Sequence, residues 1–184
     1  MNGVVMGIDP GLNGGLAVLT LEGEHIDSIR MPTIKGKHET IDVRRIKQWM
    51  TAYPFTNFRL ILMEESGARP IGGEAAERGQ SRGSRASNSF IRGIGNIEGA
   101  IKVLSYPFDL VTPQRWQRAI LGAKPSGLDP AAARAWSKSA CIGYVQRRFP
   151  TANLFPGKCS KPHDGIADAI GVAEFARRQV VGEN

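Results

Sequence analysis

The sequence is poor in cysteine, with only Cys141 and Cys159 among its 184 residues. The two are not spaced as a CxxC pair and no Cys/His quartet lies near them, so neither a zinc site nor a disulfide framework is indicated. The chain also lacks any apolar run approaching the roughly 18 residues that cross a bilayer. We therefore expect a cytosolic protein with two reduced thiols and no membrane partner.

Acidic residues are scarce in two long stretches, although the whole chain has 17 Asp and Glu against 24 Lys and Arg, a net charge of +7. From Leu110 to His163 the only acid is Asp129, and from Arg78 to Ile97 there is none. A solubilising surface explains the basic composition of many proteins. Two separate basic stretches favour a polyanionic partner, and nucleic acid in particular.

Apolar runs separated by turn residues predict the fold class. The spacing indicates strands at 3–8, 15–20, 25–31, 59–66 and 108–111, and helices at 40–52, 87–104, 112–122, 131–149 and 164–179. Residues 67–86, rich in Gly, Arg and Ser, predict a long exposed loop. Thr112 is expected to cap the helix that follows it, with Pro113 in the first turn. We expect one domain over residues 1–184, of the α/β class, with a mixed sheet flanked by helices.

Carboxylates stand at the ends of two predicted strands. Asp9 ends the first strand, where Pro10 and Gly11 turn the chain away, and capping of a turn is an ordinary use of Asp before these residues. Glu64 and Glu65 end a separate apolar strand. Because adjacent positions on a strand face opposite sides, only one of these two glutamates can share a face with Asp9.

A second acidic pair lies on the last predicted helix. Asp164 and Asp168 are four residues apart, which places them on one helix face, where like charges repel by roughly 0.2–0.5 kcal/mol. The helix dipole partly explains Asp164, near the helix start, but not Asp168 in the second turn. A cation would neutralise this repulsion.

The acids come from a first strand, a later strand and a late helix, and such elements can bring them together. Carboxylate oxygens suit a hard cation such as Mg²⁺, and two ions about 3.5–4 Å apart can promote phosphodiester hydrolysis. The predicted metal ligands are Asp9, Glu64, Asp164 and Asp168. No Walker A loop, Ser/His/Asp order or GxGxxG motif supports a competing chemistry.

These motifs resemble those of the RuvC family of Holliday junction resolvases, which belongs to the ribonuclease H-like superfamily. The resemblance is carried by GIDPG at 7–11, ILMEES at 61–66 and HDGIADA at 163–169, the last similar to versions found in phage-encoded relatives. VTPQRWQRAILG at 111–122 resembles the segment around the helix that follows the fifth strand of the family. Lys138, followed by serine, resembles the lysine that heads a DNA-facing helix. The resemblance spans about residues 7–176.

The resemblance implies a five-stranded ribonuclease H-like fold and a homodimer that makes paired, symmetric nicks in four-way DNA junctions. It implies two Mg²⁺ ions, for which Mn²⁺ substitutes, and a location in a bacterial cytosol or a phage-infected cell. It matches Glu64 to the second acid of the family and leaves Glu65 as its neighbour. Many relatives space the two helical acids three apart, whereas position 165 here is glycine. His163 could therefore replace or assist Asp164, or be a surface residue at the helix start.

The residues predicted to contact DNA are all Lys or Arg of the acid-poor stretches. They are Arg78, Arg82, Arg85, Arg92, Arg118, Lys124 and Lys138. Trp116, in an apolar helix, is expected to pack in the core rather than to stack on a base.

Other functions stay open at this point. A flap- or branch-specific nuclease, or a nuclease that cuts RNA:DNA hybrids, could use the same acids on the same fold. A junction-binding protein without catalysis would not need all four carboxylates. An actin-like ATPase can also begin with a strand, an Asp and a Gly-containing turn, but its second phosphate-binding repeat is missing here.

Overall fold

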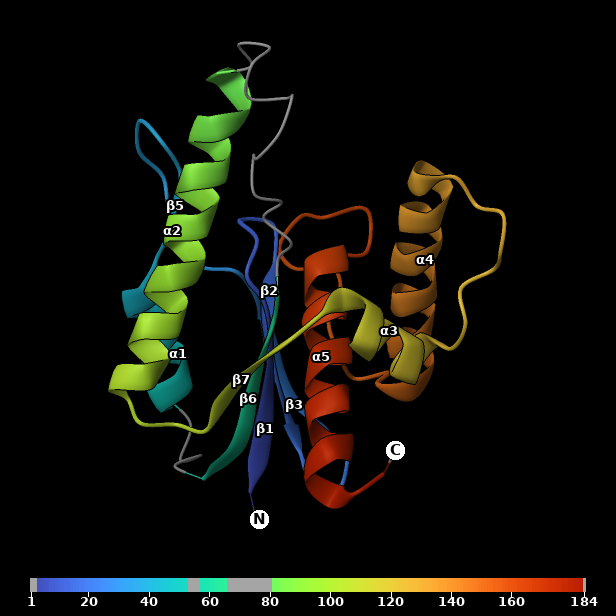
Figure 1. The fold of residues 1–184 in the computed structure, drawn as a ribbon. Helices are drawn as coiled ribbons and strands as arrows, with labels where there is room; N and C mark the ends of the chain where they lie inside the picture. The colour runs from blue at the N-terminus through green and yellow to red at the C-terminus, as the bar shows by residue number, and fades with distance from the viewer. Residues whose placement is uncertain (1–2, 53–56, 66–80, 184) are drawn as a thin grey trace.

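A five-stranded sheet forms the centre of the computed structural model, which describes residues 3–52, 57–65 and 81–183 (Figure 1). The strands of the sheet are β1 (Val4–Asp9), β2 (Gly15–Thr20), β3 (His25–Arg30), β6 (Phe58–Glu64) and β7 (Phe108–Val111). Their order is β3-β2-β1-β6-β7; β1 to β3 are antiparallel, and β6 and β7 run parallel to β1. The predicted mixed five-stranded sheet is confirmed.

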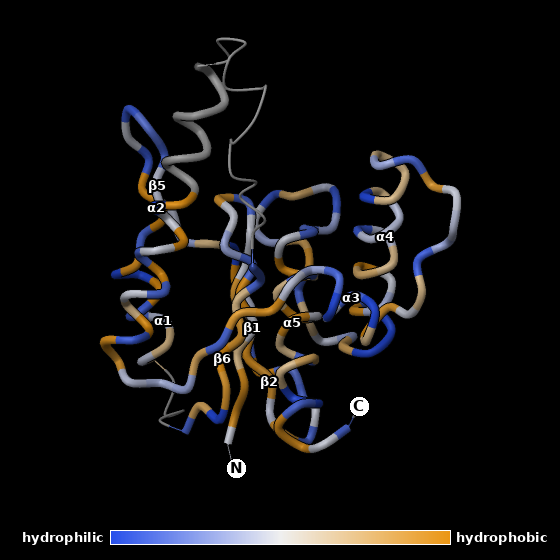
Figure 2. Tube along the Cα trace, in the orientation of Figure 1, coloured by the Kyte–Doolittle hydropathy of each residue, from blue (hydrophilic) through white to orange (hydrophobic). Residues whose placement is uncertain are grey.

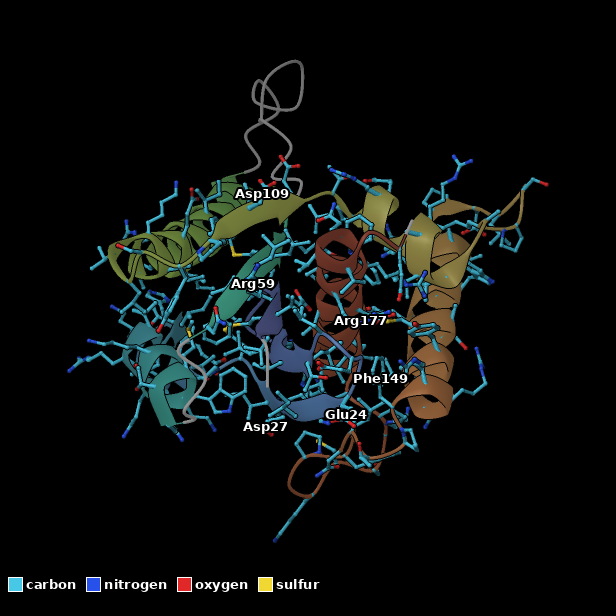
Figure 3. All side chains as sticks on the ribbon, turned by 90° about the horizontal axis from the view of Figure 1, so that it is seen from below. Glu24, Asp27, Arg59, Asp109, Phe149 and Arg177 are labelled. Carbon is cyan, nitrogen blue, oxygen red and sulfur yellow. The ribbon has the colours of Figure 1, made fainter. Side chains whose placement is uncertain are left out.

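Helices cover both faces of this sheet (Figures 1 and 3). One face carries α1 (Val43–Ala52) and α2 (Ser81–Val103). The other carries α5 (Asp164–Val181), which packs directly on β1 and β2, with α3 (Pro113–Leu121) and α4 (Pro130–Arg148) against it. None of the helices in the described ranges is both long enough and apolar enough to cross a membrane.

The helix predicted from residue 40 is wrong at its start. Thr40 and Ile41 form strand β5 (Thr40–Ile41), which pairs with β4 (Thr33–Ile34) in a two-stranded sheet. The helix begins after Asp42, whose carboxylate accepts hydrogen bonds from the backbone N–H groups of Arg44 and Arg45. A side chain that caps a helix in this way fixes its first turn, and Ile41 before it is buried.

The long loop predicted over 67–86 is also wrong at its end, because α2 already begins at Ser81. The later turns of α2 are packed in the core through Ile97 and Ile101. Once part of a helix is formed, adding further polar residues to it costs little free energy. The spacing of apolar residues therefore underestimates the length of this helix. The rest of the predicted loop lies outside the described residues. Thr112 and Pro113 precede and begin α3 as predicted, but the Thr112 side chain makes no capping hydrogen bond.

Alternate residues of β1, β2 and β6 enter two separate cores, one on each face of the sheet. Figure 2 shows these strands as largely hydrophobic between the helix layers. Val5 and Leu62 pack on the side of α5, whereas Ile8 and Met63 pack on the side of α1 and α2. The parallel register places Ile8 beside Met63. The next residues along the two strands therefore come together on the α5 side, since side chains alternate with a period of two.

Glycines allow α5 to approach the sheet closely. A Cβ atom on Gly7 of β1 would lie 2.1 Å from the carbonyl oxygen of Ala169, and one on Gly165 would lie 2.1 Å from the carbonyl oxygen of Asn13. Both distances are far below van der Waals contact, so the helix backbone rests directly on β1 and on the turn between β1 and β2. The sequence pattern did not reveal this contact.

Gly7→Ala should lower the free energy of unfolding by about 3 kcal/mol or more, because the added methyl group must push α5 off the sheet. The measurement is urea unfolding followed by circular dichroism. Gly99→Ala is the matched control, since a Cβ atom on Gly99 of α2 meets nothing within 4 Å. Alanine should there stabilise the helix by up to about 1 kcal/mol. Equal effects of the two changes would contradict the close-packing explanation.

Candidate active site

The carboxyl ends of β1 and β6 meet the first turns of α5, at the upper end of the sheet in Figure 1. This junction brings together the four acids that were predicted as metal ligands. Asp9 and Glu64 end neighbouring parallel strands, and Asp168 lies close enough that both raise its pKa. Asp164 raises the pKa of Asp9 and of Asp168 in the same way.

Asp9 is held by the turn that follows it. Its Oδ1 accepts a hydrogen bond of 3.3 Å from the backbone N–H of Gly11. Burial raises the pKa of Asp9 to about 6, against the opposing effects of Gly11 and of the Lys138 ammonium group. The predicted turn-capping use of Asp9 is thus present, but the carboxylate is also partly buried among other acids.

Glu64 receives a hydrogen bond that the sequence analysis missed. The indole Nε1–H of Trp116 donates to its Oε2 at 2.6 Å. Trp116 is fully buried, as predicted, and a buried indole N–H needs an acceptor, which was the available signal for this contact. Burial raises the pKa of Glu64 to about 7, although the bond from Trp116 opposes the shift.

Among the acids of the site, Asp168 has the pKa that lies furthest from its ordinary value. Burial, followed by the charges of Asp9 and Glu64, raises the pKa of Asp168 to about 8. The thiol of Cys141, a fully buried residue of α4, lies close enough to Asp168 to oppose this pKa shift. Sequence reasoning treated Cys141 only as a reduced thiol, because a lone cysteine carries no spacing that points to a partner.

Asp164 pairs with Lys138 of α4. Burial alone would raise the pKa of Asp164, but the hydrogen bond and charge of Lys138 hold it below its ordinary value. Lys138 was predicted as a DNA contact. The structure places its ammonium group on a carboxylate of the site and leaves the side chain more than half exposed.

His163 and Glu65 take different positions from these acids. His163 is the N-cap of α5, where its Nδ1 accepts a hydrogen bond of 3.2 Å from the backbone N–H of Ile166. Burial and the charge of Arg30 lower the pKa of His163. Glu65 is exposed beyond the end of β6, and its backbone N–H donates to the carbonyl of Val111.

The close contact at Gly165 explains why no acid stands at that position. A side chain there would collide with the turn of Asn13 and Gly14. Asp164, one residue earlier, carries the carboxylate that reaches the site instead.

The predicted DNA contacts are only partly described. Arg92 on α2, Arg118 on α3 and Lys124 after α3 are exposed. Arg82 and Arg85 lie within α2, but their side chains are outside the described part of the structure, and so is Arg78 altogether.

No protein-family model and no curated protein sequence matches the chain significantly. Among solved structures, Thermus thermophilus RuvC in complex with a Holliday junction substrate superimposes with a TM-score of 0.61 at 16% identity, covering 98% of this chain and 97% of RuvC. A second structure of Thermus thermophilus RuvC gives a TM-score of 0.53 at 18% identity, with the same coverage. This chain has the ribonuclease H-like fold of RuvC.

The donor set of the acidic site suits a divalent cation. All four candidate ligands are carboxylates, which are the hard oxygen donors that Mg²⁺ prefers. Burial, followed by repulsion from Asp9 and Glu64, raises the pKa of Asp168, and a bound cation would relieve that repulsion. As the described side chains stand, no three His, Cys, Asp or Glu residues among them form a ready metal-binding group.

Without divalent cations, the free energy of unfolding should fall as pH rises from about 4 to about 8. Asp168 has an ordinary pKa of 3.8 and a folded pKa of about 8, so within this window the folded state holds a proton that the unfolded state has lost. Above about pH 8 the folded state has also lost this proton, so its stabilising effect is absent. Asp168→Asn should be more stable than the parent protein at pH 8 by several kcal/mol, because the pKa of Asp168 rises from 3.8 to about 8 and one pKa unit is worth about 1.4 kcal/mol.

The measurement is urea unfolding in EDTA over this pH range. Asp109→Asn is the control, because Asp109 is an exposed acid on β7 (Figure 3). Parallel pH profiles for the Asp168→Asn variant and the parent would rule out Asp168 as the source of the dependence.

Proposed function

We propose that this protein is a structure-selective DNA endonuclease that resolves four-way junctions by metal-dependent hydrolysis of phosphodiester bonds. The observation that carries the proposal is the convergence of Asp9, Glu64 and Asp168 at one end of a RuvC-like sheet. The solved RuvC with this fold is in complex with a Holliday junction substrate. The basic composition of the chain suits the same kind of polyanion.

In this proposal, Asp9, Glu64, Asp168 and Asp164 hold Mg²⁺, with two ions expected and Mn²⁺ as a substitute. The bound ions would polarise the phosphate and lower the pKa of a bound water. The protein itself supplies a partly buried, acidic setting in which solvent competes only weakly with the carboxylates for a cation.

Asp164 is the fourth acid in this proposal, because its charge acts on Asp9 and Asp168. His163 instead holds the start of α5 through its bond to Ile166. Glu65, exposed after the end of β6, has no role in the reaction.

The DNA backbone is proposed to contact exposed cations near both helix layers. Arg92, Arg118 and Lys124 are suited to phosphates because they are exposed, while Lys138 sits where the backbone would meet the acids. Arg78, Arg82 and Arg85 stay predictions. A homodimer, which would place two such sites on the two sides of a junction, stays a prediction as well, as do the phage-type branch and the cytosolic location.

The experiment is a Mg²⁺-dependent cleavage assay on a synthetic four-way junction, with a linear duplex, a Y-fork and an RNA:DNA hybrid as parallel substrates. Symmetric nicks on the junction support a resolvase. Preferential cutting of forks or hybrids would contradict junction resolution, and junction binding without any cutting would contradict catalysis.

Asp9→Asn, Glu64→Gln and Asp168→Asn should each reduce cutting by at least about 10³-fold, because each removes a charge that the metal ions need. Junction binding, measured by gel shift in Ca²⁺ or EDTA, should change little. Asp109→Asn, an equal charge change at an exposed acid, should cut normally. Normal turnover of any one of the three site variants would remove that residue from the site.

Arg92→Ala should weaken junction binding and reduce the slope of log affinity against log salt by about one, because one phosphate contact is lost. Arg59→Ala is the matched control, since Arg59 is exposed near the start of β6, away from Glu64 at its end (Figure 3). Binding over a range of KCl concentrations gives both slopes. An unchanged slope for Arg92→Ala would refute this contact.

A further inference from the structure

Trp116 connects the hydrophobic core to the acidic site. Its indole is fully buried among residues of the α5-side core, and its Nε1–H donates to Oε2 of Glu64 at 2.6 Å. The remaining ring therefore belongs to the core, whereas its one polar atom belongs to the site. A short hydrogen bond to a carboxylate is among the stronger bonds of a protein.

The indole is fixed on its far side by α5. A Cβ atom on Gly171 would lie 2.7 Å from Cζ3 and 3.3 Å from Cη2 of Trp116, so the six-membered ring lies directly on the helix backbone at this glycine. The same position faces the sulfur of Cys141, at 3.4 Å from such a Cβ atom. Close packing on a backbone leaves the ring little freedom to turn, and the direction of its N–H is fixed accordingly.

The short segment between β7 and α3 fixes the other side of the indole. Glu64 at the end of β6 pairs with Val111 at the end of β7, and the N–H of Glu65 donates to the Val111 carbonyl at 2.7 Å. Helix α3 starts two residues after Val111, so Trp116 lies in its first turn, beside the strand end that carries Glu64. A short connection of this kind keeps the indole N–H of Trp116 next to the carboxylate of Glu64.

We propose that Trp116 is a positioning residue that holds the Glu64 carboxylate in the orientation required for metal binding. The proposal deepens the proposed function and rests on it for the identity of the metal site. The contact uses one carboxylate oxygen, Oε2. The carboxylate plane is thereby fixed by a group that is itself locked between β7 and α5.

A neutral donor suits this task better than a cation. The indole N–H orients the carboxylate without cancelling its charge, so Glu64 keeps its attraction for a metal ion. Asp164 shows the contrast, because its partner Lys138 is charged and is itself a competitor for the site.

Trp116→Phe tests the role directly, because phenylalanine keeps an aromatic ring against Gly171 but lacks the N–H. Loss of a hydrogen bond that orients a ligand typically lowers metal affinity or activity by about 10- to 100-fold. We expect a loss of this size in Mn²⁺ affinity, measured from the electron paramagnetic resonance signal of free Mn²⁺. The Mg²⁺ concentration for half-maximal junction cutting should rise equally, with junction binding unchanged.

Trp49→Phe is the matched control. Trp49 of α1 donates its indole N–H to Oδ2 of Asp27 at 2.9 Å, so the variant removes the same kind of hydrogen bond away from the acidic site. Its Mn²⁺ affinity and its cutting should equal those of the parent protein. Equal losses in both variants would overturn the proposal, because they would show a general structural effect.

A second measurement does not depend on the folding of the Trp116→Phe variant. In ¹⁵N-labelled parent protein, the indole N–H signal of Trp116 should move clearly when Glu64 is changed to Gln, because a charged acceptor becomes neutral. The Trp49 signal should not move. An unmoved Trp116 signal, or a Trp116→Phe variant with parental Mn²⁺ affinity, would overturn the positioning role. If the parent protein cuts no junction, the proposed function fails, but the indole and Mn²⁺ measurements still decide this role.

Discussion

The direct contact between α5 and the sheet is the constraint on which the rest of the structure depends. Gly7 and Gly165 let the helix backbone touch β1 and the turn that follows it, with no side chain between them. That contact fixes where α5 lies along β1, and it therefore fixes the position of Asp168 relative to Asp9. It also forbids a side chain at position 165, so the acid of the first helical turn stands at 164.

The acidic site that this contact creates works against the stability of the folded protein. Burial and mutual repulsion raise the pKa of Asp9, Glu64 and Asp168, so these groups resist ionisation in the folded state. Neighbouring side chains moderate the cost of ionising the site acids, which include Asp164, in different ways. Trp116 offers a neutral N–H to Glu64, whereas Lys138 offers a full charge to Asp164. Clusters of acids that oppose folding in this way are typical of functional sites.

Most of the sheet and the helices could be predicted because their signals are local. Apolar runs with turn residues between them marked the five strands, and apolar periods marked most helices to within two residues. The exceptions have local causes as well. The two-residue strands β4 and β5 are too short for a period, and the start of α2 at Ser81 lies in a polar stretch that continues a helix packed further along.

The sequence by itself determined which acids end which elements, because strand alternation and helical spacing are properties of neighbouring residues. Asp9 and Glu64 at strand ends, and Asp168 on the face of a late helix, follow from those periods alone. The tertiary structure decided their partners. Trp116 is 52 residues from Glu64, and Lys138 is 26 residues from Asp164. Such contacts depend on how closely the packed elements approach one another, and here glycines without a side chain set that distance.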